Sequence, residues 1–510
     1  MLACVLSSAL LGVDAYIIQV ETDISSGLPS FNTVGLPDSA VKESKDRVTA
    51  AIKNSDFHFP SSRITINLAP ADVRKEGSAF DLPIALGILA ATGQVETDRL
   101  DQLMTVGELA LDGRIRSVNG SLPIALSTRA NHLSGLLIPQ ANAKEVAMID
   151  GLDIYPVESL QQVIHFLNGK ISIPPFSYNA EEELEKQSQH MVDFSDVKGQ
   201  EHVKRAIEVA AAGGHNIIMI GPPGSGKTMI AKRIPTILPR MDLEESLEST
   251  KIHSILGLVN EQMPLVATRP FRSPHHTISD AGLIGGGRIP KPGEVSLSHN
   301  GVLFLDELPE FRKNVLEVMR QPLEDGQVTI SRANAALTYP ANFMLVAAMN
   351  PCPCGFFGDM SRECRCSPDQ MQKYISRISG PLLDRIDIQV EVPAVKYQDL
   401  ASSADGEPSS QIHNRIQGAR EIQQSRFEST NIYSNASMRP KEIKQYCQAA
   451  DAAQELLRVA LTQLGLSARA YDRILKVSRT IADLDYSPSI ESSHISEAIQ
   501  YRSLDRNYWQ

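Results

Sequence analysis

A glycine-rich loop in the middle of the chain carries the clearest chemical pattern in the sequence. It follows the apolar run Asn216–Ile220, which predicts a strand, and it leads into a helix expected to begin near Thr228. Glycines let backbone N–H groups turn inward around phosphates, and the positive end of the helix dipole favours the same anions. Lys227 is expected to reach the β- and γ-phosphates of ATP, and Thr228 to bind Mg²⁺. The predicted nucleotide-binding residues are Gly221, Pro222, Pro223, Gly224, Ser225, Gly226, Lys227 and Thr228.

An acidic pair follows a second apolar run. Val302–Leu305 predicts a buried strand, and Asp306 and Glu307 come directly after it. Ligands of open α/β sheets bind at the carboxyl ends of the strands, so both carboxylates are placed to act on the nucleotide. We expect Asp306 to support Mg²⁺ and Glu307 to polarise the attacking water. A bare acidic pair is usually a solvated turn, but the phosphate loop upstream favours the catalytic interpretation.

A third polar residue, Asn350, ends the apolar strand predicted at Phe343–Met349. An asparagine before a proline, here Pro351, is more often a turn initiator. Its place one strand after the acidic pair favours a role in positioning the water or sensing the γ-phosphate.

Four of the six cysteines lie together as two Cys-x-Cys pairs separated by nine residues. Two close pairs joined by a short loop suit four thiolates around one tetrahedral Zn²⁺, and four thiolates leave no open position for water. The expected role is therefore structural, in a loop over 352–366 beside Asn350. The alternatives are two disulfides or plain thiols, and a reducing compartment argues against the disulfides. The predicted zinc ligands are Cys352, Cys354, Cys364 and Cys366.

Length and composition limit the classes of protein that can hold these residues. The 510 residues predict about three domains. The formal charge of −11 is not that of an overtly basic nucleic-acid binder, since backbone binding depends on Lys and Arg. No apolar run approaches the ~18 residues of a membrane span, and the apolar start Met1–Val13 lacks the basic region of a signal peptide. We expect a cytoplasmic protein with no membrane partner.

The pattern of predicted strands and helices along the chain changes at two places. The first ~170 residues alternate strand-like and helical runs, as in Arg63–Leu68 and Leu82–Thr92, which is typical of an α/β domain. Pro174-Pro175 and the acidic run Glu181–Glu185 then predict a linker over 171–193. The motifs above lie in 194–395. Helical patterns dominate 396–510, at Ile412–Phe427, Pro440–Leu464 and Ala468–Asp483.

Longer motifs surround these residues and carry a family resemblance. They include Gly27-Leu-Pro-Ser-Phe31, Val34-Gly-Leu-Pro-Asp38, Pro270-Phe-Arg-Ser-Pro-His-His-Thr-Ile-Ser-Asp280, Gly285-Gly-Gly287, the run Gly293–Glu310 and Ser379-Gly-Pro-Leu-Leu-Asp-Arg-Ile-Asp387. Over nearly the whole chain the sequence resembles the ComM/YifB subfamily of magnesium-chelatase-like AAA+ ATPases. The resemblance implies a Lon-protease-like (ribosomal S5-type) α/β domain over 1–170, an AAA+ core with a parallel sheet over 194–395, and a helical lid over 396–510.

The resemblance also implies an activity. The family is associated with homo-hexameric, ATP-driven DNA helicases that act in branch migration and homologous recombination during natural transformation, with recombination proteins as candidate partners. Single- or double-stranded DNA would pass through the ring pore. The alternative functions are those of an ATP-dependent Lon-like protease, a chelatase-type ATPase motor that acts without DNA, and an ATP-gated assembly scaffold.

Three arginines take catalytic roles by resemblance. Arg385 matches the arginine finger of related helicases, which reaches a neighbour's site, with Arg377 as a competitor for that role. Arg469 matches the lid arginine called sensor 2. The alternative for each is a surface arginine in a salt bridge.

The N-terminal domain is expected to lack peptidase activity. By resemblance, Ser78 lies at the position of the catalytic serine, but Leu122 stands where Lon carries its lysine. A leucine cannot take the hydroxyl proton, and Lys75 would need unusual geometry to replace it. We expect a retained fold that serves ring assembly or DNA contact.

DNA contacts are expected on a β-hairpin at Gln327–Pro340, which related helicases insert into the ring pore. Each candidate basic residue has the alternative of a solvated surface charge. His275 and His276 are expected to pack or form hydrogen bonds, since no acid or cysteine stands at metal-ligand spacing. The candidate DNA-binding residues are Arg332, Arg272, Arg288 and Lys291.

Overall fold

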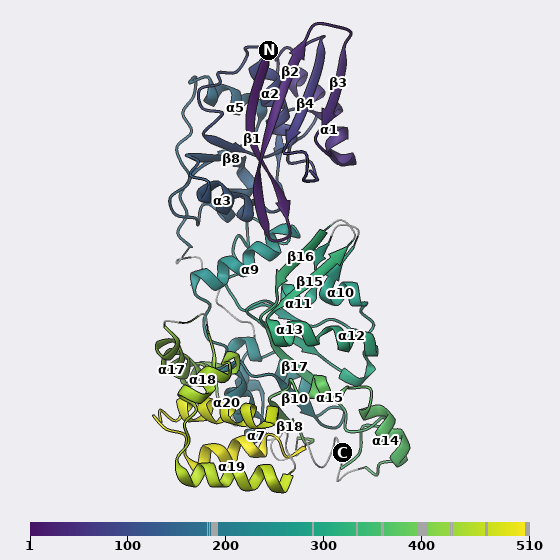
Figure 1. Cartoon of the computed structure of the whole chain (residues 1–510), viewed down its shortest axis with the longest axis vertical. Coiled ribbons are helices and arrows are strands. Elements are labelled where there is room, and N and C mark those ends of the chain that lie inside the picture. The colour runs from purple at the N-terminus through teal and green to yellow at the C-terminus, as the bar shows by residue number, and fades with distance from the viewer. Residues whose placement is uncertain are drawn as a thin grey trace. The chain divides into compact units, whose positions relative to one another are not determined.

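A computed structural model describes residues 1–180, 182, 184, 192–287, 290–332, 335–358, 362–395, 406–428, 430, 432–464 and 468–504. The chain forms two compact units, which Figure 1 shows in the context of the whole chain. The first comprises Met1–Gln187 and Leu243–Ala267, and the second comprises Ser188–Asp242 and Thr268–Gln510. Part of the predicted linker, at 181, 183 and 185–191, lies outside the described residues.

The first unit alternates strands and helices, as its sequence texture predicts. Its elements are β1 (Leu2–Leu11), β2 (Asp14–Ser25), β3 (Ser30–Val34), α1 (Ser39–Asn54), β4 (Arg63–Ala69), α2 (Asp81–Ala91), β5 (Leu103–Thr105), β6 (Glu108–Leu109), β7 (Ile115–Arg116), α3 (Ser121–Ala130), β8 (Gly135–Pro139), α4 (Ala143–Val146), β9 (Asp153–Val157), α5 (Leu160–Leu167) and α9 (Leu243–Ile255).

A seven-stranded mixed sheet organises this unit, in the order β3-β4-β2-β1-β5-β8-β9. The apolar start of the chain is its strand β1, which pairs antiparallel with β2 from Leu2↔Asp23 to Leu11↔Asp14. Successive strand residues face opposite sides of a sheet. Leu137 accordingly lies in one hydrophobic core and its neighbours Leu136 and Ile138 in another, so apolar residues are buried on both faces.

The segment 243–267 belongs to the first unit, although the sequence places it inside the predicted 194–395 core. Its helix α9 packs on α3, where the Gly120 amide donates to the Ser254 carbonyl at 3.0 Å. The Lys251 ammonium lies 3.2 Å from the Asp14 carboxylate. The second unit is therefore built from two stretches of chain on either side of this segment.

The second unit contains the phosphate loop, the acidic pair and the C-terminal helices. Its elements are α7 (Glu201–Gly213), β10 (Ile217–Ile220), α8 (Lys227–Ala231), β11 (Phe271–Arg272), α10 (Asp280–Ile284), β12 (Gly285–Gly286), β13 (Lys291–Pro292), α11 (Glu294–Leu297), β14 (Val302–Leu305), α12 (Lys313–Val318), α13 (Arg320–Asp325), β15 (Gln327–Arg332), β16 (Ala335–Pro340), β17 (Met344–Met349), α14 (Pro368–Ile375), α15 (Gly380–Leu383), β18 (Ile388–Glu391), α17 (Ser409–Phe427), α18 (Pro440–Tyr446), α19 (Asp451–Leu464), α20 (Ala468–Leu484) and α21 (Ser492–Gln500).

A five-stranded parallel sheet forms the centre of the second unit, as expected, in the order β11-β14-β17-β10-β18. Every residue of β10, β14 and β17 is buried. Continuous apolar runs of this kind are typical of parallel strands covered on both faces. Because these three strands are neighbours, the residues that follow them meet at one edge of the sheet.

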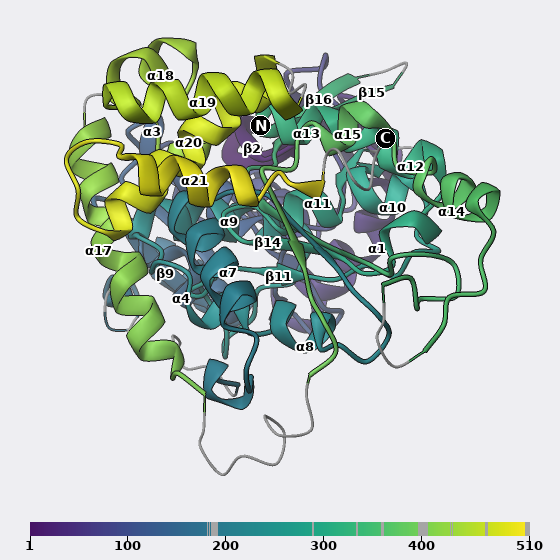
Figure 2. The same cartoon turned by 90° about the horizontal axis from the view of Figure 1, so that it is seen from below.

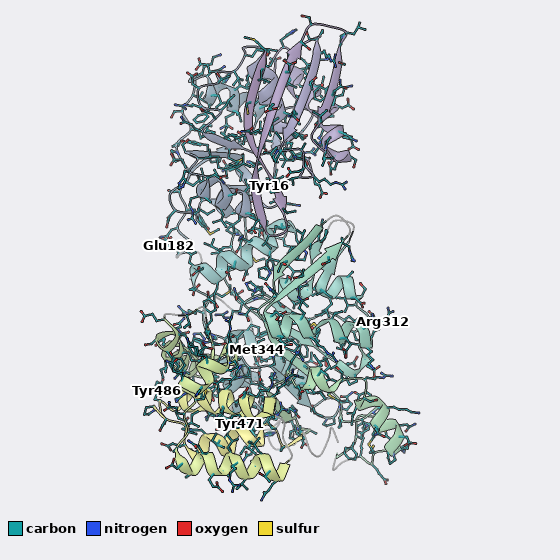
Figure 3. The ribbon with its side chains drawn as sticks, viewed as in Figure 1. Tyr16, Glu182, Arg312, Met344, Tyr471 and Tyr486 are labelled. Carbon is teal, nitrogen blue, oxygen red and sulfur yellow. The ribbon has the colours of Figure 1, made fainter. Side chains whose placement is uncertain are left out.

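The C-terminal helices share a single hydrophobic core with the sheet. Ile474 and Ile481 of α20 pack in the same cluster as Val203 and Ile207 of α7. Helix α21 lies against both α19 and α20 (Figure 2). Tyr471 near the start of α20 and Tyr486 just beyond its end are exposed (Figure 3).

One helical prediction was wrong in detail. The pattern Pro440–Leu464 forms two helices, α18 and α19, rather than one. The chain between them pairs elsewhere, since the Ala450 amide donates to the Ile490 carbonyl at 3.1 Å. Within the described residues, no helix combines the length and apolarity needed to cross a bilayer.

Candidate functional site

The phosphate loop joins β10 to α8, as the motif requires. Gly226 precedes α8 with φ +91°, a conformation that side chains rarely adopt, and this turn directs the following residues into the helix. Ser225 is buried, while Pro223, Gly224 and Thr228 are exposed. The tip of the loop, at Pro223 and Gly224, and the residue Thr228 are thus open to solvent, while Ser225 is enclosed by the protein.

Lys227 is held by its own loop. Its Nζ donates to the carbonyl oxygens of Gly221 at 2.7 Å and Pro222 at 2.9 Å. A further contact of 3.3 Å reaches Asn350 Oδ1, so the structure brings the phosphate loop and the third strand end together. Burial lowers the pKa of Lys227 to about 8, although Asp306 opposes the shift. An anion in the loop would offer the ammonium the negative partner that burial makes favourable.

The structure also brings together the two residues predicted to bind Mg²⁺. Thr228 donates its hydroxyl to Asp306 Oδ2 at 2.6 Å. The hydroxyl and carboxylate supply oxygen donors, the class of ligand that Mg²⁺ prefers. Asp306 also accepts from the Glu307 amide at 3.0 Å. These donors fit a hard cation at the edge of the loop.

Glu307 has two features that the sequence did not predict. Its φ of +55° is left-handed, which is uncommon for a residue with a side chain. Its Oε2 lies 3.2 Å from His276 Nδ1. The expectation that His276 forms hydrogen bonds or packs is confirmed, and its partner is the predicted catalytic carboxylate. The sequence drew attention to His276 only through the motif that contains it. Its contact with Glu307 could not be predicted, because His276 and Glu307 are distant in sequence.

The predicted catalytic arginines all meet acidic groups of their own chain. Arg385 is largely buried and pairs with Glu324, while it also donates to the Pro381 carbonyl at 2.6 Å. Arg377 donates to Glu310 at 2.8 Å and to the Pro309 carbonyl at 3.2 Å. Arg469 is exposed, 3.7 Å from Asp384.

A buried ion pair joins Asp387, at the end of the motif Ser379–Asp387, to α20. Asp387 pairs with Arg473 and lies 3.6 Å from His215 Nδ1. Burial alone would raise the pKa of Asp387, but Arg473 and His215 outweigh it and hold that pKa well below its usual range. Arg473 was missed because an arginine on a helix has no local signal that identifies a distant partner.

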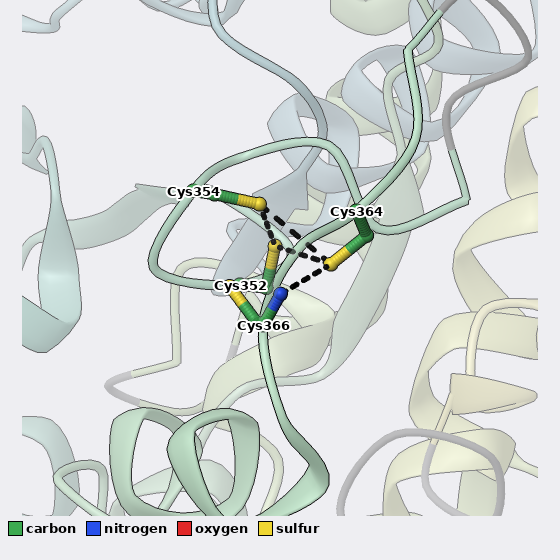
Figure 4. A group of neighbouring side chains, drawn as sticks. All are labelled: Cys352, Cys354, Cys364 and Cys366. Atoms are coloured by element: carbon green, nitrogen blue, oxygen red, sulfur yellow. Dashed lines mark hydrogen bonds between the residues drawn. The ribbon is translucent and has the colours of Figure 1, made fainter.

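The four predicted zinc ligands converge (Figure 4). Their sulfur atoms all lie within 4.8 Å of one another, and three pairs are separated by 3.3 to 3.6 Å. Tetrahedral zinc with bonds of about 2.3 Å would place the sulfurs about 3.8 Å apart. Backbone amides of Phe356 and Arg365 lower the pKa of Cys354 to about 6, which favours its thiolate, whereas burial raises the pKa of Cys366 to about 12 and the pKa of Cys364 is also raised, against the effect of the Cys366 amide. The cluster therefore has the donor chemistry and the size of a structural metal site.

The cysteine loop touches the phosphate loop directly. Gly355 has φ +87°, and a Cβ built there would lie 2.6 Å from the Pro223 ring. Its amide donates to the Cys352 carbonyl at 2.9 Å. The backbone of the cysteine loop therefore packs on the exposed tip of the phosphate loop.

The partner of Ser78 among the described residues is a carboxylate. Ser78 donates its hydroxyl to the Glu108 carboxylate. Leu122 is fully buried in the hydrophobic core. Lys75 is also buried, and its Nζ donates to the Pro70 carbonyl. A carboxylate accepts this serine hydroxyl, and the Lys75 amine, which could only have substituted for the lysine of a Lon-type dyad, is directed to a carbonyl.

The candidate DNA-binding residues differ in their surroundings. The predicted hairpin forms as β15 and β16, and Arg332 at its tip end is exposed, with Nε 3.4 Å from the Gly287 carbonyl. Lys291 is exposed on β13. Arg272 makes a two-point ion pair with Glu294, at 2.6 and 2.8 Å. Arg288 lies outside the described residues.

Comparison with known proteins covers almost the whole chain. Three family models match: "Subunit ChlI of Mg-chelatase" at 20–142, "Magnesium chelatase, subunit ChlI" at 193–400 and "Magnesium chelatase, subunit ChlI C-terminal" at 406–502. Competence protein ComM of Haemophilus influenzae is 46% identical over 99% of this chain and 98% of its own length. The chain belongs to the ComM/YifB subfamily of magnesium-chelatase-like AAA+ ATPases.

Other relatives agree with the ComM/YifB assignment. The protein YifB of Escherichia coli is 45% identical over 99% of this chain and 98% of its own length. The magnesium-chelatase 38 kDa subunit of Rhodobacter capsulatus is 21% identical over 45% of this chain and 68% of that protein. The resemblance seen in the motifs is confirmed, and membership of this family implies ATPase activity.

Proposed function

We propose that this ComM/YifB chain is a DNA motor, a hexameric helicase that uses ATP hydrolysis to drive branch migration in recombination. The ATPase part of this proposal is supported by contacts between the residues that follow three neighbouring strands, β10, β14 and β17. Lys227 contacts Asn350 at 3.3 Å, and Thr228 contacts Asp306 at 2.6 Å. The phosphate-binding, metal-binding and water-positioning groups thus lie at one edge of the parallel sheet.

Each residue of this edge has a role in ATP hydrolysis. Lys227 exchanges the carbonyls of its own loop for phosphate oxygens, and Thr228 and Asp306 hold Mg²⁺. A Mg²⁺ ion held by Thr228 and Asp306 would supply positive charge against the charge that develops on the phosphate oxygens. Glu307 orients the attacking water and takes up its proton. Asn350, already beside Lys227, positions the water against the γ-phosphate.

Arg385 serves as the arginine finger of the ring. Arg377 contacts Pro309 and Glu310, which follow the acidic pair of its own subunit. Arg385 is also bound within its own subunit, by Glu324, so the choice of Arg385 over Arg377 rests on the resemblance of its motif to that of related helicases. Arg385 must leave Glu324 to reach the neighbouring site, where it stabilises transition-state charge. Arg469 completes the site from the lid.

The β15–β16 hairpin is the proposed DNA contact. The exposed residues of its strand β15 are polar, among them Thr329, Ser331 and Arg332, and hydroxyls and guanidinium groups bind phosphates. One arginine per subunit is enough in a ring, because six copies sum their charge around the pore. The name of the relative ComM, a competence protein, supports a role in the uptake of DNA.

The cysteine cluster is proposed to hold a structural Zn²⁺. Four sulfurs within 4.8 Å satisfy the geometry, and Gly355 packs the loop on Pro223. The metal would keep the cysteine loop folded against the phosphate loop and take no part in the chemistry.

Steady-state ATP turnover with and without DNA tests the proposed function. Single- and double-stranded DNA are each expected to raise the rate, and Glu307→Gln is expected to remove turnover while ATP still binds. A rate that no form of DNA changes would contradict the motor and favour a chelatase-type ATPase.

We propose that the N-terminal unit supports assembly or DNA contact rather than proteolysis, because Ser78 meets Glu108 and Leu122 is buried. Incubation with casein and ATP is expected to leave the casein intact. Degradation that disappears in Ser78→Ala would establish the protease instead.

A further inference from the structure

One asparagine ties together three segments of the second unit at the edge where its parallel strands begin. Asn216 comes directly before β10, and its side-chain Oδ1 accepts a hydrogen bond from the Leu345 amide of β17 at 2.8 Å. Its Nδ2 donates to the Arg385 carbonyl at 2.9 Å. The Asn216 carbonyl accepts from the amides of Asp387 at 2.9 Å and Ile388 at 3.0 Å. Asn216 thus binds the chain on both sides of the proposed finger segment (384–387).

The chemistry of these two side-chain contacts selects an asparagine. The Leu345 amide can only donate a hydrogen bond, and the Arg385 carbonyl can only accept one. A primary amide offers an acceptor and a donor on the same short side chain. An aspartate at position 216 would keep the acceptor for Leu345 and lose the donor to Arg385, while an alanine would lose both.

The finger segment is held from other directions as well. Arg502, a buried residue just beyond α21, donates to the Ile386 carbonyl at 2.6 Å. Asp387 pairs with Arg473 of α20. The backbone around Arg385 is therefore fixed by β10 on one side and by the C-terminal helices on the other.

The side chain of Arg385 is less completely satisfied than its backbone. Its Nη1 donates to the Pro381 carbonyl at 2.6 Å, and its Nη2 pairs with Glu324. Its Nε is buried, and no hydrogen-bond partner for this atom lies among the described residues. A buried donor without a partner is costly, and an anionic oxygen of a bound nucleotide would offer it one. A guanidinium that moves from a fixed backbone keeps a defined reach.

Asn216 and the phosphate loop lie at opposite ends of the same strand. The four residues of β10 separate them, and at about 3.3 Å per residue the strand spans about 13 Å. Strands β10, β17 and β18 run parallel, so the finger segment lies at the edge away from the nucleotide site of its own subunit. A change at the Nδ2 contact is therefore expected to affect a neighbour's site more than its own.

We propose that Asn216 is a positioning residue for the arginine finger, whose side chain fixes the backbone from which Arg385 reaches the nucleotide of the neighbouring subunit. The inference rests on the proposed function, since it takes Arg385 as the finger. Asn216 then supports hydrolysis in the next subunit of the ring and contributes nothing to the binding of ATP in its own.

Mixed rings of the full-length protein test this role. Lys227→Ala removes the ATP site of a chain and keeps its finger, and Arg385→Ala does the reverse. Adding Asn216→Ala to the Lys227→Ala chain is expected to lower ATP turnover by the mixture about 10- to 100-fold, the effect of a small misplacement of a catalytic group. Adding Asn216→Ala to the Arg385→Ala chain removes the support of a finger that is already absent, so turnover and the affinity for ATP are expected to stay the same.

Two further variants sharpen the comparison. Asn216→Asp keeps the acceptor for the Leu345 amide, and it is expected to lower turnover only in the Lys227→Ala chain, as Asn216→Ala does. The matched control is Asn342→Ala, an exposed asparagine at the same edge of the sheet, two residues before β17. Asn342→Ala is expected to leave turnover unchanged in either chain.

The placement of the substitution decides the outcome. Equal turnover for the two placements of both Asn216 variants, whether normal or low, would overturn the proposal, because a residue that supports the fold or the phosphate loop acts in every chain. A mixture of Lys227→Ala and Arg385→Ala that recovers no activity is a different result. The assignment of the finger to Arg385 would then fail, and the role of Asn216 would fail with it.

Discussion

Three charged side chains of this ComM/YifB ATPase each contact another group of the same chain. Lys227 donates to carbonyls of its own loop, Arg385 is bound to Glu324, and Glu307 is bound to His276. Lys227 and Arg385 are largely buried, where a charge would be costly to leave unpaired. The residue types at the site could be predicted from the sequence because the phosphate loop is a local motif. The partners of Arg385 and Glu307 could not, since both lie far along the chain.

Asp387 gives a prediction about stability. Asp387→Asn leaves Arg473 without its charged partner in a buried position, and we expect a loss of about 3–5 kcal/mol in the free energy of unfolding at pH 7. The pKa of Asp387 is held below its usual range, so its contribution is present above the unfolded pKa of about 4 and is lost as the pH falls below it. Urea titrations of wild type and variant should therefore converge only below about pH 4.

The control for this prediction is Asp384→Asn. Asp384 is substantially exposed and lies 3.7 Å from Arg469, so the expected loss is below about 1 kcal/mol. Equal losses for Asp384→Asn and Asp387→Asn, or a difference between wild type and Asp387→Asn that does not change with pH, would contradict the account.

At the scale of elements, the strands were predicted better than the helical connections. The apolar runs at β10, β14 and β17 are unambiguous because both faces of each strand are buried. The break between α18 and α19 was missed because it depends on a backbone contact to Ile490, not on a proline or glycine. The placement of α9 in the first unit was missed for the same reason: its contacts are with distant residues of the chain.

The cysteine loop gives a prediction at this scale. The protein as purified is expected to contain about one zinc per chain, from one four-thiolate site. Removal of the metal with a chelator should raise the KM for ATP, because the loop packs on Pro223 of the phosphate loop through Gly355. Cys364→Ser should have the same effect, and the control Cys4→Ser, outside the cluster, should have none. Metal-free protein with an unchanged KM would contradict the proposed support of the phosphate loop.

At the scale of the whole molecule, the net charge of the chain limits where DNA could bind. A net charge of −11 argues against binding DNA over the outer surface. The proposed ring would need only a few basic residues per subunit facing its pore, and Arg332 on the hairpin is proposed as one of them. The length of the chain predicts about three domains, whereas the structure forms two compact units. The difference arises because the C-terminal helices share the hydrophobic core of the ATPase sheet.

A mixing experiment tests whether the ring completes its active site between subunits. Lys227→Ala is expected to lose ATP binding and Arg385→Ala to lose kcat by about 10³–10⁵-fold. Mixed rings contain some sites with an intact loop beside an intact finger, so the mixture should recover activity that neither variant shows alone. Activity retained by Arg385→Ala, with loss in Arg377→Ala, would assign the finger to Arg377 instead.

The central claim is that ATP hydrolysis at this site moves DNA. The direct measurement is branch migration of a fluorescently labelled branched DNA by the purified full-length protein, with Glu307→Gln as the matched variant. Wild type with ATP and Mg²⁺ is predicted to release the labelled strand, while Glu307→Gln binds the DNA and ATP and releases none. Rapid ATP hydrolysis by wild type on the same DNA with no strand released would contradict the account.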